Sequence, residues 1–227
     1  MNIPTYVVHY NKLKERKSYL SPLLKNAVWQ EYPDRDIIKQ EEIEHWYKPD
    51  REEWFNRCYG LYKVDMPFRE LKTGDVCCSL GHITSWRMFL ENDNNEWALF
   101  LEDDVILCDD FYGKLHNIME IKPKCDAMFL GGGFDHTIAP TILEKNIGGF
   151  NFILKDHPAT NCLCSYMLHR DIAEKMLRYL SDNKTVTPID FEVNFLFRMF
   201  QAEVYHIIPM LCIEGSSQGR YQSVQIR

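Results

Sequence analysis

Residues 96–107 of this chain read Glu-Trp-Ala-Leu-Phe-Leu-Glu-Asp-Asp-Val-Ile-Leu. An apolar run, residues 97–101, ends abruptly in three consecutive acids, Glu102, Asp103 and Asp104. A short apolar run bounded in this way predicts a buried strand whose end opens into a loop. The stretch therefore predicts a core strand that carries a cluster of carboxylates at its carboxyl end.

The clustered carboxylates themselves suggest a chemistry. Three neighbouring negative charges repel one another, and burial of an unpaired charge is unfavourable. Mg²⁺ and Mn²⁺ remove that conflict because they bind carboxylate oxygens and commonly link them to substrate phosphates. With 33 acids in 227 residues, about 0.7 acidic triplets are expected by chance, so a solvated loop is the alternative interpretation. The position at a strand end, before a second apolar run at 105–107, favours a metal site that holds a nucleotide diphosphate.

Length and composition predict a single globular domain. Apolar residues make up 45% of the 227 residues and aromatic residues 13%, which excludes a disordered chain. We expect one domain over residues 1–227, with a core at about 3–212 and a polar tail at 215–227. The net charge of −7 argues against nucleic acid or an anionic membrane surface as the main partner. No transmembrane segment or signal peptide is visible, so we expect a cytoplasmic protein.

The eight cysteines do not follow a disulfide or zinc pattern. Their spacing matches neither a small secreted scaffold nor a zinc ribbon, so we expect free, buried thiols in a reducing compartment. The cysteines stand at positions 58, 77, 78, 108, 125, 162, 164 and 212.

Strands alternate with helices along the chain. The apolar pattern predicts strands at residues 5–10, 36–39, 97–101, 126–130, 147–154, 162–168 and 204–208. It predicts helices at residues 12–26, 79–91, 110–119, 171–180 and 191–200. The segment 31–72 is otherwise expected to be irregular. This alternation indicates an α/β fold with ligands at the carboxyl ends of the strands, where the acidic triplet falls.

Two further residues have both a structural and a functional interpretation. His82, beside Gly81 at the start of an expected helix, is either a packed core histidine or a ligand. Asp190 precedes another expected helix, where it serves either as a helix N-cap or as a carboxylate that binds or deprotonates an acceptor hydroxyl. The residues alone leave both pairs open.

Several weaker signals remain. The glycines at 131–133 form either a phosphate cradle or a strand-to-loop turn. His206 and Glu214 flank the last expected strand and could supply a metal ligand or a base, although incidental placement is the simpler interpretation. Basic residues after the first strand could neutralise a diphosphate or form an exposed helix face; they are Lys12, Lys14, Arg16 and Lys17.

Taken in order, five stretches resemble glycosyltransferase family 25. Residues 101–105 match the Leu-Glu-Asp-Asp-Val core of that family, and this block is the specific one. In the block 74–86, Gly81 stands where the family usually has serine and Cys77 where it has glycine. The other similar stretches are the opening strand with its following arginine at 5–16, a strand and helix at 164–168 and 173–177, and Pro-Ile-Asp at 188–190.

The resemblance implies a GT-A-type (Rossmann-like) mixed sheet flanked by helices. It also implies inverting transfer from a nucleotide-sugar donor, usually a UDP-sugar, to a hydroxyl group, with Mn²⁺ (or Mg²⁺) as the cofactor. Glu102 and Asp104 match the ends of the metal motif, and Asp103 lies between them on the donor ribose or sugar. His82 and Asp190 match family positions that line the cleft.

These residues together suggest a mechanism. Asp104, with Glu102 direct or through water, would hold the cation that grips the donor diphosphate. Asp190 would deprotonate the acceptor hydroxyl, and Arg16 would steady the nucleotide. The expected acceptor is a glycan, a lipopolysaccharide or a glycoprotein. The alternatives are a nucleotide-sugar-binding protein without transferase activity and a metal-dependent phosphohydrolase.

Overall fold

The apolar run before the acidic triplet forms a central strand, β3 (Trp97–Glu102). The computed structural model describes residues 3–24, 26–62, 66–92, 94–131, 140–160 and 162–221. In β3, the residues from Trp97 to Leu101 are all buried. The prediction of a core strand at this position is therefore confirmed.

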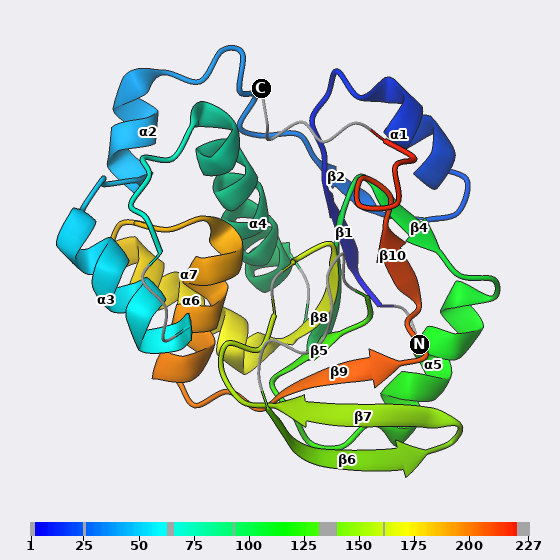
Figure 1. The fold of residues 1–227 in the computed structure, drawn as a ribbon. Helices are drawn as coiled ribbons and strands as arrows, with labels where there is room; N and C mark the ends of the chain where they lie inside the picture. Colours follow the sequence, from blue (N-terminus) through cyan, green and yellow to red (C-terminus); the bar gives the residue numbers. More distant parts are fainter. Residues whose placement is uncertain are drawn as a thin grey trace.

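The described strands form one large mixed sheet and one small sheet (Figure 1). The order in the large sheet is β2-β1-β3-β8-β5-β9-β7-β6. Strand β1 pairs in parallel with β2 and with β3, whereas β8 lies antiparallel between β3 and β5. The bounds are β1 (Thr5–Val8), β2 (Val28–Gln30), β5 (Ala127–Phe129), β6 (Thr141–Ile147), β7 (Phe150–Lys155), β8 (Ser165–His169) and β9 (Val204–Ile208). The small antiparallel sheet pairs β4 (Val105–Leu107) with β10 (Cys212–Glu214).

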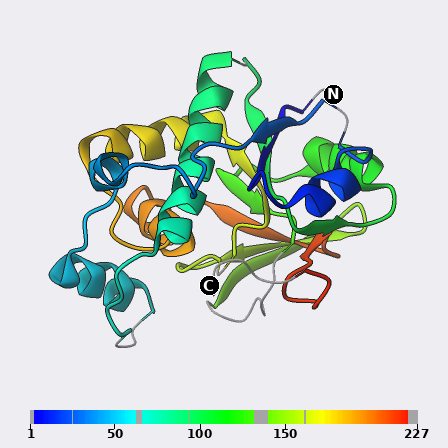
Figure 2. The same cartoon turned by 90° about the horizontal axis from the view of Figure 1, so that it is seen from above.

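Helices cover both faces of the large sheet. Figures 1 and 2 show α4, α6 and α7 on one side and α1 and α5 on the other. The bounds are α1 (Lys14–Leu20), α2 (Gln40–Trp46), α3 (Arg51–Tyr62), α4 (Thr73–Asn92), α5 (Phe111–Ile121), α6 (Arg170–Asp182) and α7 (Ile189–Met199). The predicted α/β fold, a mixed sheet flanked by helices, is confirmed.

The two covered faces explain why β3 is apolar without interruption. Successive side chains of a strand point to opposite faces of the sheet. Phe100 therefore packs in one core cluster with Trp86 of α4, and its ring stacks on Tyr166 of β8 at 5.3 Å between centroids. Leu99 packs in the other cluster with Leu115 of α5. A strand that is buried on both sides therefore reads as a continuous apolar run, without alternating polar and apolar residues.

The largest error of the sequence prediction lies in the segment 31–72. The strand expected at 36–39 is wrong, because residues 35–37 form a turn and the second strand is β2, before this segment. The segment also contains α2 and α3, where irregular chain was expected. Helix α2 buries none of its side chains, so it lacks the apolar stripe by which a helix is recognised in a sequence.

Other element boundaries also differ from the prediction. Helix α1 is shorter than the expected 12–26, and α4 begins at Thr73 instead of residue 79, which places His82 in the middle of the helix. Strand β9 matches the expectation at 204–208, but it is not the last strand, because β10 follows it. Of the glycines at 131–133, Gly131 bridges to Cys212, and the other two lie outside the described residues.

All eight cysteines are free thiols, as expected. Cys78 and Cys108 are partly exposed, whereas the other six are buried. The reducing compartment inferred from them stays a prediction. Among the helices that the structure describes, none has both the length and the apolar character that crossing a bilayer requires.

Candidate functional site

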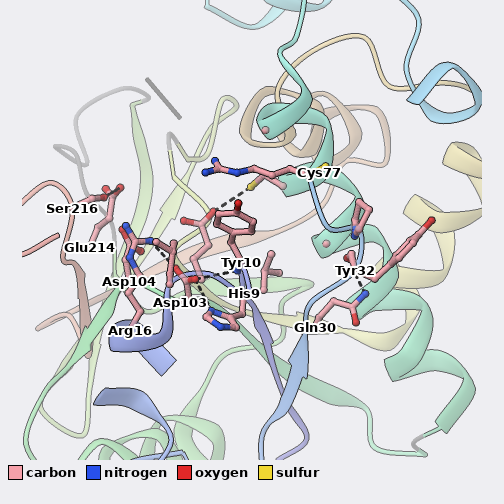
Figure 3. Close-up of a pocket in the computed structure, with 18 residues that line it drawn as sticks. His9, Tyr10, Arg16, Gln30, Tyr32, Cys77, Asp103, Asp104, Glu214 and Ser216 are labelled. Carbon is pink, nitrogen blue, oxygen red and sulfur yellow. Dashed lines mark hydrogen bonds and ion pairs between the residues drawn. The ribbon is translucent and has the colours of Figure 1, made fainter. Parts of the chain in front are cut away.

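Three parallel strands end at the same edge of the sheet and line a cavity there. Strand β1 leads into His9 and Tyr10, β2 ends at Gln30 and β3 ends at Glu102. All four side chains line one cavity. Figure 3 shows Asp103, Asp104 and Glu214 on one side of it and Gln30 and Tyr32 on the opposite side. The carboxyl ends of parallel strands are where α/β folds bind ligands.

Asp103, the middle acid of the triplet, is neutralised inside the protein. One of its carboxylate oxygens accepts a hydrogen bond from Arg16 Nη1 at 2.7 Å. The other lies 2.8 Å from His9 Nδ1 and 3.2 Å from the amide nitrogen of Tyr10. Asp103 and Arg16 are each 5% exposed, so their ion pair is a buried one. Arg16 therefore reaches the cavity wall as the partner of Asp103.

The two outer acids have different surroundings from Asp103. Asp104 is 4% exposed, and its Oδ1 atom is buried and has no hydrogen-bond partner among the described residues. Burial, together with the charges of Asp104 and Glu214, raises the pKa of Glu102 to about 8. A buried carboxylate oxygen without a hydrogen-bond partner, in the electrostatic reach of a second carboxylate, is a donor set that suits a hard divalent cation. The residues present thus fit Mn²⁺ or Mg²⁺.

Glu214 joins this acidic group through the small sheet. The register of β4 and β10 pairs Glu214 with Val105, which follows Asp104 directly. The amide nitrogen of Gly215 donates to the carbonyl oxygen of Asp104 at 2.9 Å. A Cβ atom at Gly215 would lie 2.5 Å from that oxygen, so glycine permits the close approach. Sequence reasoning treated Glu214 as incidental because it did not find β10.

His82 combines the two roles that the sequence left open. Its side chain is completely buried, with Nδ1 2.8 Å from Tyr166 Oη and Nε2 3.4 Å from Glu102 Oε1. Trp86 Nε1 also donates to Tyr166 Oη at 2.8 Å. Burial lowers the pKa of His82 to about 4, which keeps the ring neutral at pH 7. His82 is a packed core residue that also contacts the acidic group.

Asp190 lies in the first turn of α7, beside a second cavity. Pro188 occupies the N-cap position, so the N-cap interpretation of Asp190 is wrong. Burial raises the pKa of Asp190 to about 7, and the charge of Glu102 contributes in the same direction. Cys78 lines both the first cavity and this second one. The second cavity is also lined by Trp54, Met66, Pro67, Arg69, Asp75 and Phe191.

The four basic residues after β1 do not gather at the first cavity, as a diphosphate-binding group would. Of the four, only Arg16 lines the first cavity. Lys12 and Lys17 form ion pairs with surface acids, and Lys14 is exposed. Arg35 also lines the cavity, and the sequence analysis did not identify it because the segment 31–72 was expected to be irregular apart from a strand at 36–39.

His206 is directed elsewhere. It lies within β9, where its Nε2 atom donates to the carbonyl oxygen of Ala159 and its ring stacks on Phe129 at 5.2 Å. It lines neither of the two cavities. The simpler interpretation of His206, incidental placement, agrees with these contacts.

Comparisons with known proteins identify the family of this chain. The model of glycosyltransferase family 25 (LPS biosynthesis protein) matches residues 2–193. The chain is also similar to the solved structure titled "Crystal Structure of A197 from STIV", with 12% identity and a TM-score of 0.40, over 93% of this chain and 83% of that one. None of the curated proteins compared with the chain matches it.

Proposed function

This chain belongs to glycosyltransferase family 25, and from that premise we propose that it transfers a sugar from a nucleotide-sugar to an acceptor hydroxyl. Membership of the family makes it a glycosyltransferase, with the GT-A-type fold expected from the sequence. The donor we propose is a UDP-sugar. The acceptor is a glycan, a lipopolysaccharide or a glycoprotein, the transfer is inverting, and the protein works in the cytoplasm.

The observation that carries this proposal is the pair of outer acids at the end of β3. Asp104 has a buried carboxylate oxygen without a partner among the described residues. Burial and the nearby charge of Asp104 raise the pKa of Glu102. We assign both to a bound Mn²⁺ or Mg²⁺. When bound, the cation would offset the charge that develops on the departing diphosphate.

The remaining walls of the first cavity suit the rest of the donor. Tyr10, Gln30 and Tyr32 offer aromatic and amide groups to a nucleoside, and Arg35 offers a cation to its phosphates. Asp103 lines the same cavity and is held in one orientation by Arg16. We assign this pair to the donor ribose or sugar.

His82 acts on the donor side through its neighbour. It lies behind Glu102 and contacts that carboxylate. We therefore assign His82 to the donor site as a residue that positions Glu102.

The second cavity suits the acceptor. Its aromatic residues, Trp54 and Phe191, could pack on a sugar ring, and Asp190 lines the same cavity. The raised pKa of Asp190, about 7, is near the range in which a carboxylate is an effective general base at neutral pH. Cys78 lines both cavities, so the proposed donor and acceptor sites adjoin there.

The transfer then runs between the two cavities. The acceptor oxygen attacks the anomeric carbon while its proton passes to the Asp190 carboxylate. The bond between the anomeric carbon and the diphosphate oxygen breaks, and the nucleoside diphosphate leaves with the electron pair. Attack from the face opposite to the leaving group inverts the anomeric configuration.

The test begins with a screen of UDP-, GDP- and CMP-sugars, with and without Mn²⁺. A ligand that binds the folded chain raises its melting temperature by mass action, and we expect the largest rise with a UDP-sugar and Mn²⁺ together. Product analysis with acceptor glycans then separates the alternatives. Binding without turnover would indicate a degenerate relative, and nucleotide release without a glycoside would indicate a hydrolase.

A substitution tests the metal assignment. Asp104→Asn should remove the Mn²⁺-dependent rise and slow transfer by roughly 10²–10³-fold, as the loss of one electrostatic group in other active sites does. Asp109→Asn is the matched control, because Asp109 follows in the same segment and is exposed. An unchanged rate and Mn²⁺ dependence in Asp104→Asn would refute the assignment.

A further inference from the structure

A second set of potential metal ligands meets at the end of β3. Cys78 and His82 are four residues apart on α4, so both side chains lie on one face of the helix. That face lies against Glu102. The Sγ atom of Cys78, the Nε2 atom of His82 and a carboxylate oxygen of Glu102 all lie within 4.8 Å of one another.

The separations of Cys78 and His82 from Glu102 are close to those of a tetrahedral metal site. Cys78 Sγ lies 3.8 Å and His82 Nε2 3.4 Å from Glu102 Oε1. In a tetrahedral zinc site, metal–ligand distances of about 2.0–2.3 Å place neighbouring ligand atoms roughly 3.3–3.6 Å apart. The two separations from Glu102 therefore differ from those of a tetrahedral site by a few tenths of an ångström at most, and the third separation, between Cys78 and His82, is within 4.8 Å.

The surroundings of His82 also suit a metal ligand. Histidine ligands usually donate their second ring N–H to a fixed partner, which leaves the other nitrogen free to bind the metal. Nδ1 of His82 lies 2.8 Å from Tyr166 Oη, which Trp86 Nε1 also contacts. A phenol oxygen has two lone pairs, so Tyr166 can accept both hydrogen bonds. Nε2, the nitrogen that faces Glu102, then keeps its lone pair.

We propose that Cys78, His82 and Glu102 bind a borderline-soft divalent cation of the Zn²⁺ class. A thiolate and an imidazole are ligands that such cations prefer, whereas Mn²⁺ and Mg²⁺ prefer oxygen. An ion can reach the site because Cys78 and Glu102 line the first cavity. Binding releases the thiol proton of Cys78 to solvent, and three protein ligands leave a fourth position for water or substrate.

The site rests on these three side chains and does not depend on the proposed transfer reaction. Its consequence does, because Glu102 is shared with the outer-acid pair assigned to Mn²⁺. A zinc ion that takes Glu102 removes one oxygen ligand from the other set. Zn²⁺ would therefore inhibit the Mn²⁺-dependent reaction in competition with Mn²⁺. A large excess of Mn²⁺ would be needed to reverse the inhibition, because a thiolate and an imidazole favour Zn²⁺.

The direct test uses Co²⁺ as a spectroscopic probe for Zn²⁺. The metal-free full chain, reduced and titrated anaerobically, should develop a thiolate-to-cobalt charge-transfer band that saturates at one equivalent and disappears on addition of Zn²⁺. In Cys78→Ser the band should be lost. Zn²⁺ affinity should fall by more than about 100-fold, beyond the roughly 10–100-fold that loss of an outer-shell partner causes.

Cys77→Ser is the matched control, because Cys77 is adjacent, lines the same cavity and is not part of the ligand set. This variant should keep the band. No band in the wild-type chain, or a band that persists in Cys78→Ser, would overturn the proposal.

A measurement on the wild-type chain covers the case in which Cys78→Ser does not fold. Zn²⁺ should protect Cys78 from alkylation by iodoacetamide, as read by peptide mass spectrometry. Cys108 is an internal control, because it is also partly exposed and lies outside the ligand set. Equal alkylation of Cys78 with and without Zn²⁺ would also overturn the proposal.

Discussion

The three consecutive acids differ in what surrounds them. Asp103 is paired with Arg16 and contacts His9, Asp104 has a carboxylate oxygen without a partner in the described part of the chain, and Glu102 faces Cys78 and the cavity. One short motif thus supplies a structural ion pair and two candidate metal ligands. These different roles follow from the different neighbours of the three side chains.

The ion pair between Arg16 and Asp103 leads to a stability prediction. Arg16→Met keeps the length of the side chain but leaves the Asp103 carboxylate buried with weaker compensation. Loss of one partner of a buried pair costs about 3–5 kcal/mol, and the contacts of Asp103 with His9 and Tyr10 place this case near the lower value. Urea unfolding measures the change.

The matched control for this change is a surface pair on the same helix. Lys17→Met removes the ion pair with Glu31, in which both side chains are more than a third exposed. Exposed pairs contribute about 0–1 kcal/mol, so this variant should unfold at nearly the same urea concentration as the wild type. Equal losses in the two variants would show that the Arg16 pair is not important for the fold.

The assignment of Asp190 as the base makes a kinetic prediction. Asp190→Asn removes the proton acceptor but should leave the donor cavity intact, so kcat should fall by roughly 10²–10⁴-fold while Mn²⁺-dependent donor binding is retained. Asp171→Asn is a suitable control, because Asp171 also lies in the first turn of a helix but is exposed. Parallel losses of donor binding and kcat in Asp190→Asn would instead place Asp190 in the donor site.

Part of the candidate site could be predicted from the sequence alone. The change from apolar to acidic residues at the end of the strand lies within a few consecutive residues. It therefore predicted Glu102 and Asp104 as candidate metal ligands. Glu214 and Arg35 were not assigned to the site, because each reaches it only through contacts between segments far apart in the chain. The i, i+4 spacing of Cys78 and His82 was visible, but it points to shared ligation only when the helix is known to lie against β3.

Among the elements, α4 and β1 make an unusually close contact at Gly81. A Cβ atom at this position would lie 2.5 Å from Cγ1 of Val8. Val8 is β-branched and stiff at χ1, so it cannot easily turn away. The glycine therefore lets the helix approach the strand that carries His9 into the cavity, and this explains the departure from the serine usual in the family.

The close contact predicts that Gly81→Ala changes the stability in opposite directions with and without the Val8 side chain, which a double-mutant cycle can measure. In the wild-type chain, Gly81→Ala gains about 0.5–1 kcal/mol of helix stability but loses about 1–3 kcal/mol through overpacking against Val8, so it should destabilise. In a Val8→Ala background the clash is absent, and Gly81→Ala should stabilise. Urea unfolding of the four chains measures both effects. A destabilisation of the same size in both backgrounds would argue against the contact.

The predictability of elements followed their apolar patterning. Helix α6 was expected at 171–180 and is found over a similar range, because its buried residues Ile172, Ala173, Met176 and Leu180 form one stripe. Helix α4 packs against the sheet and against other helices, so its buried residues surround it and its first turns were missed. Strand β10 has only three residues, which is too short for periodicity to show.

In the molecule as a whole, the first cavity lies at the edge where β1, β2 and β3 end, and it shares Cys78 with the second cavity. This arrangement buries Glu102 and Asp190 and brings them near Glu214. Burial first, and then these neighbouring charges, raises the pKa values of Glu102 and Asp190. Without a cation, the folded chain concentrates negative charge that the unfolded chain disperses. Stability is therefore linked to pH.

The direction of this linkage follows from the pKa values of the buried groups. The pKa of Glu102 rises from 4.5 to about 8 and that of Asp190 from 3.8 to about 7 on folding. Between the unfolded and folded values, the folded chain binds more protons than the unfolded one, so the free energy of unfolding falls as pH rises. His82 has the opposite effect, but only below its unfolded value of 6.5. Without metal, stability should therefore fall from about pH 6.5 to about pH 8.

Mn²⁺ should reverse this trend. The cation binds deprotonated carboxylates, so the stabilisation that a fixed Mn²⁺ concentration provides should grow over the same pH range. Chemical unfolding at several pH values, with chelator or with Mn²⁺, measures both slopes. In Glu102→Gln the fall without metal should be smaller and the response to Mn²⁺ weaker. A metal-free stability that is flat or rises between pH 6.5 and 8 would mean that the acids at the strand ends are not held together as the fold places them.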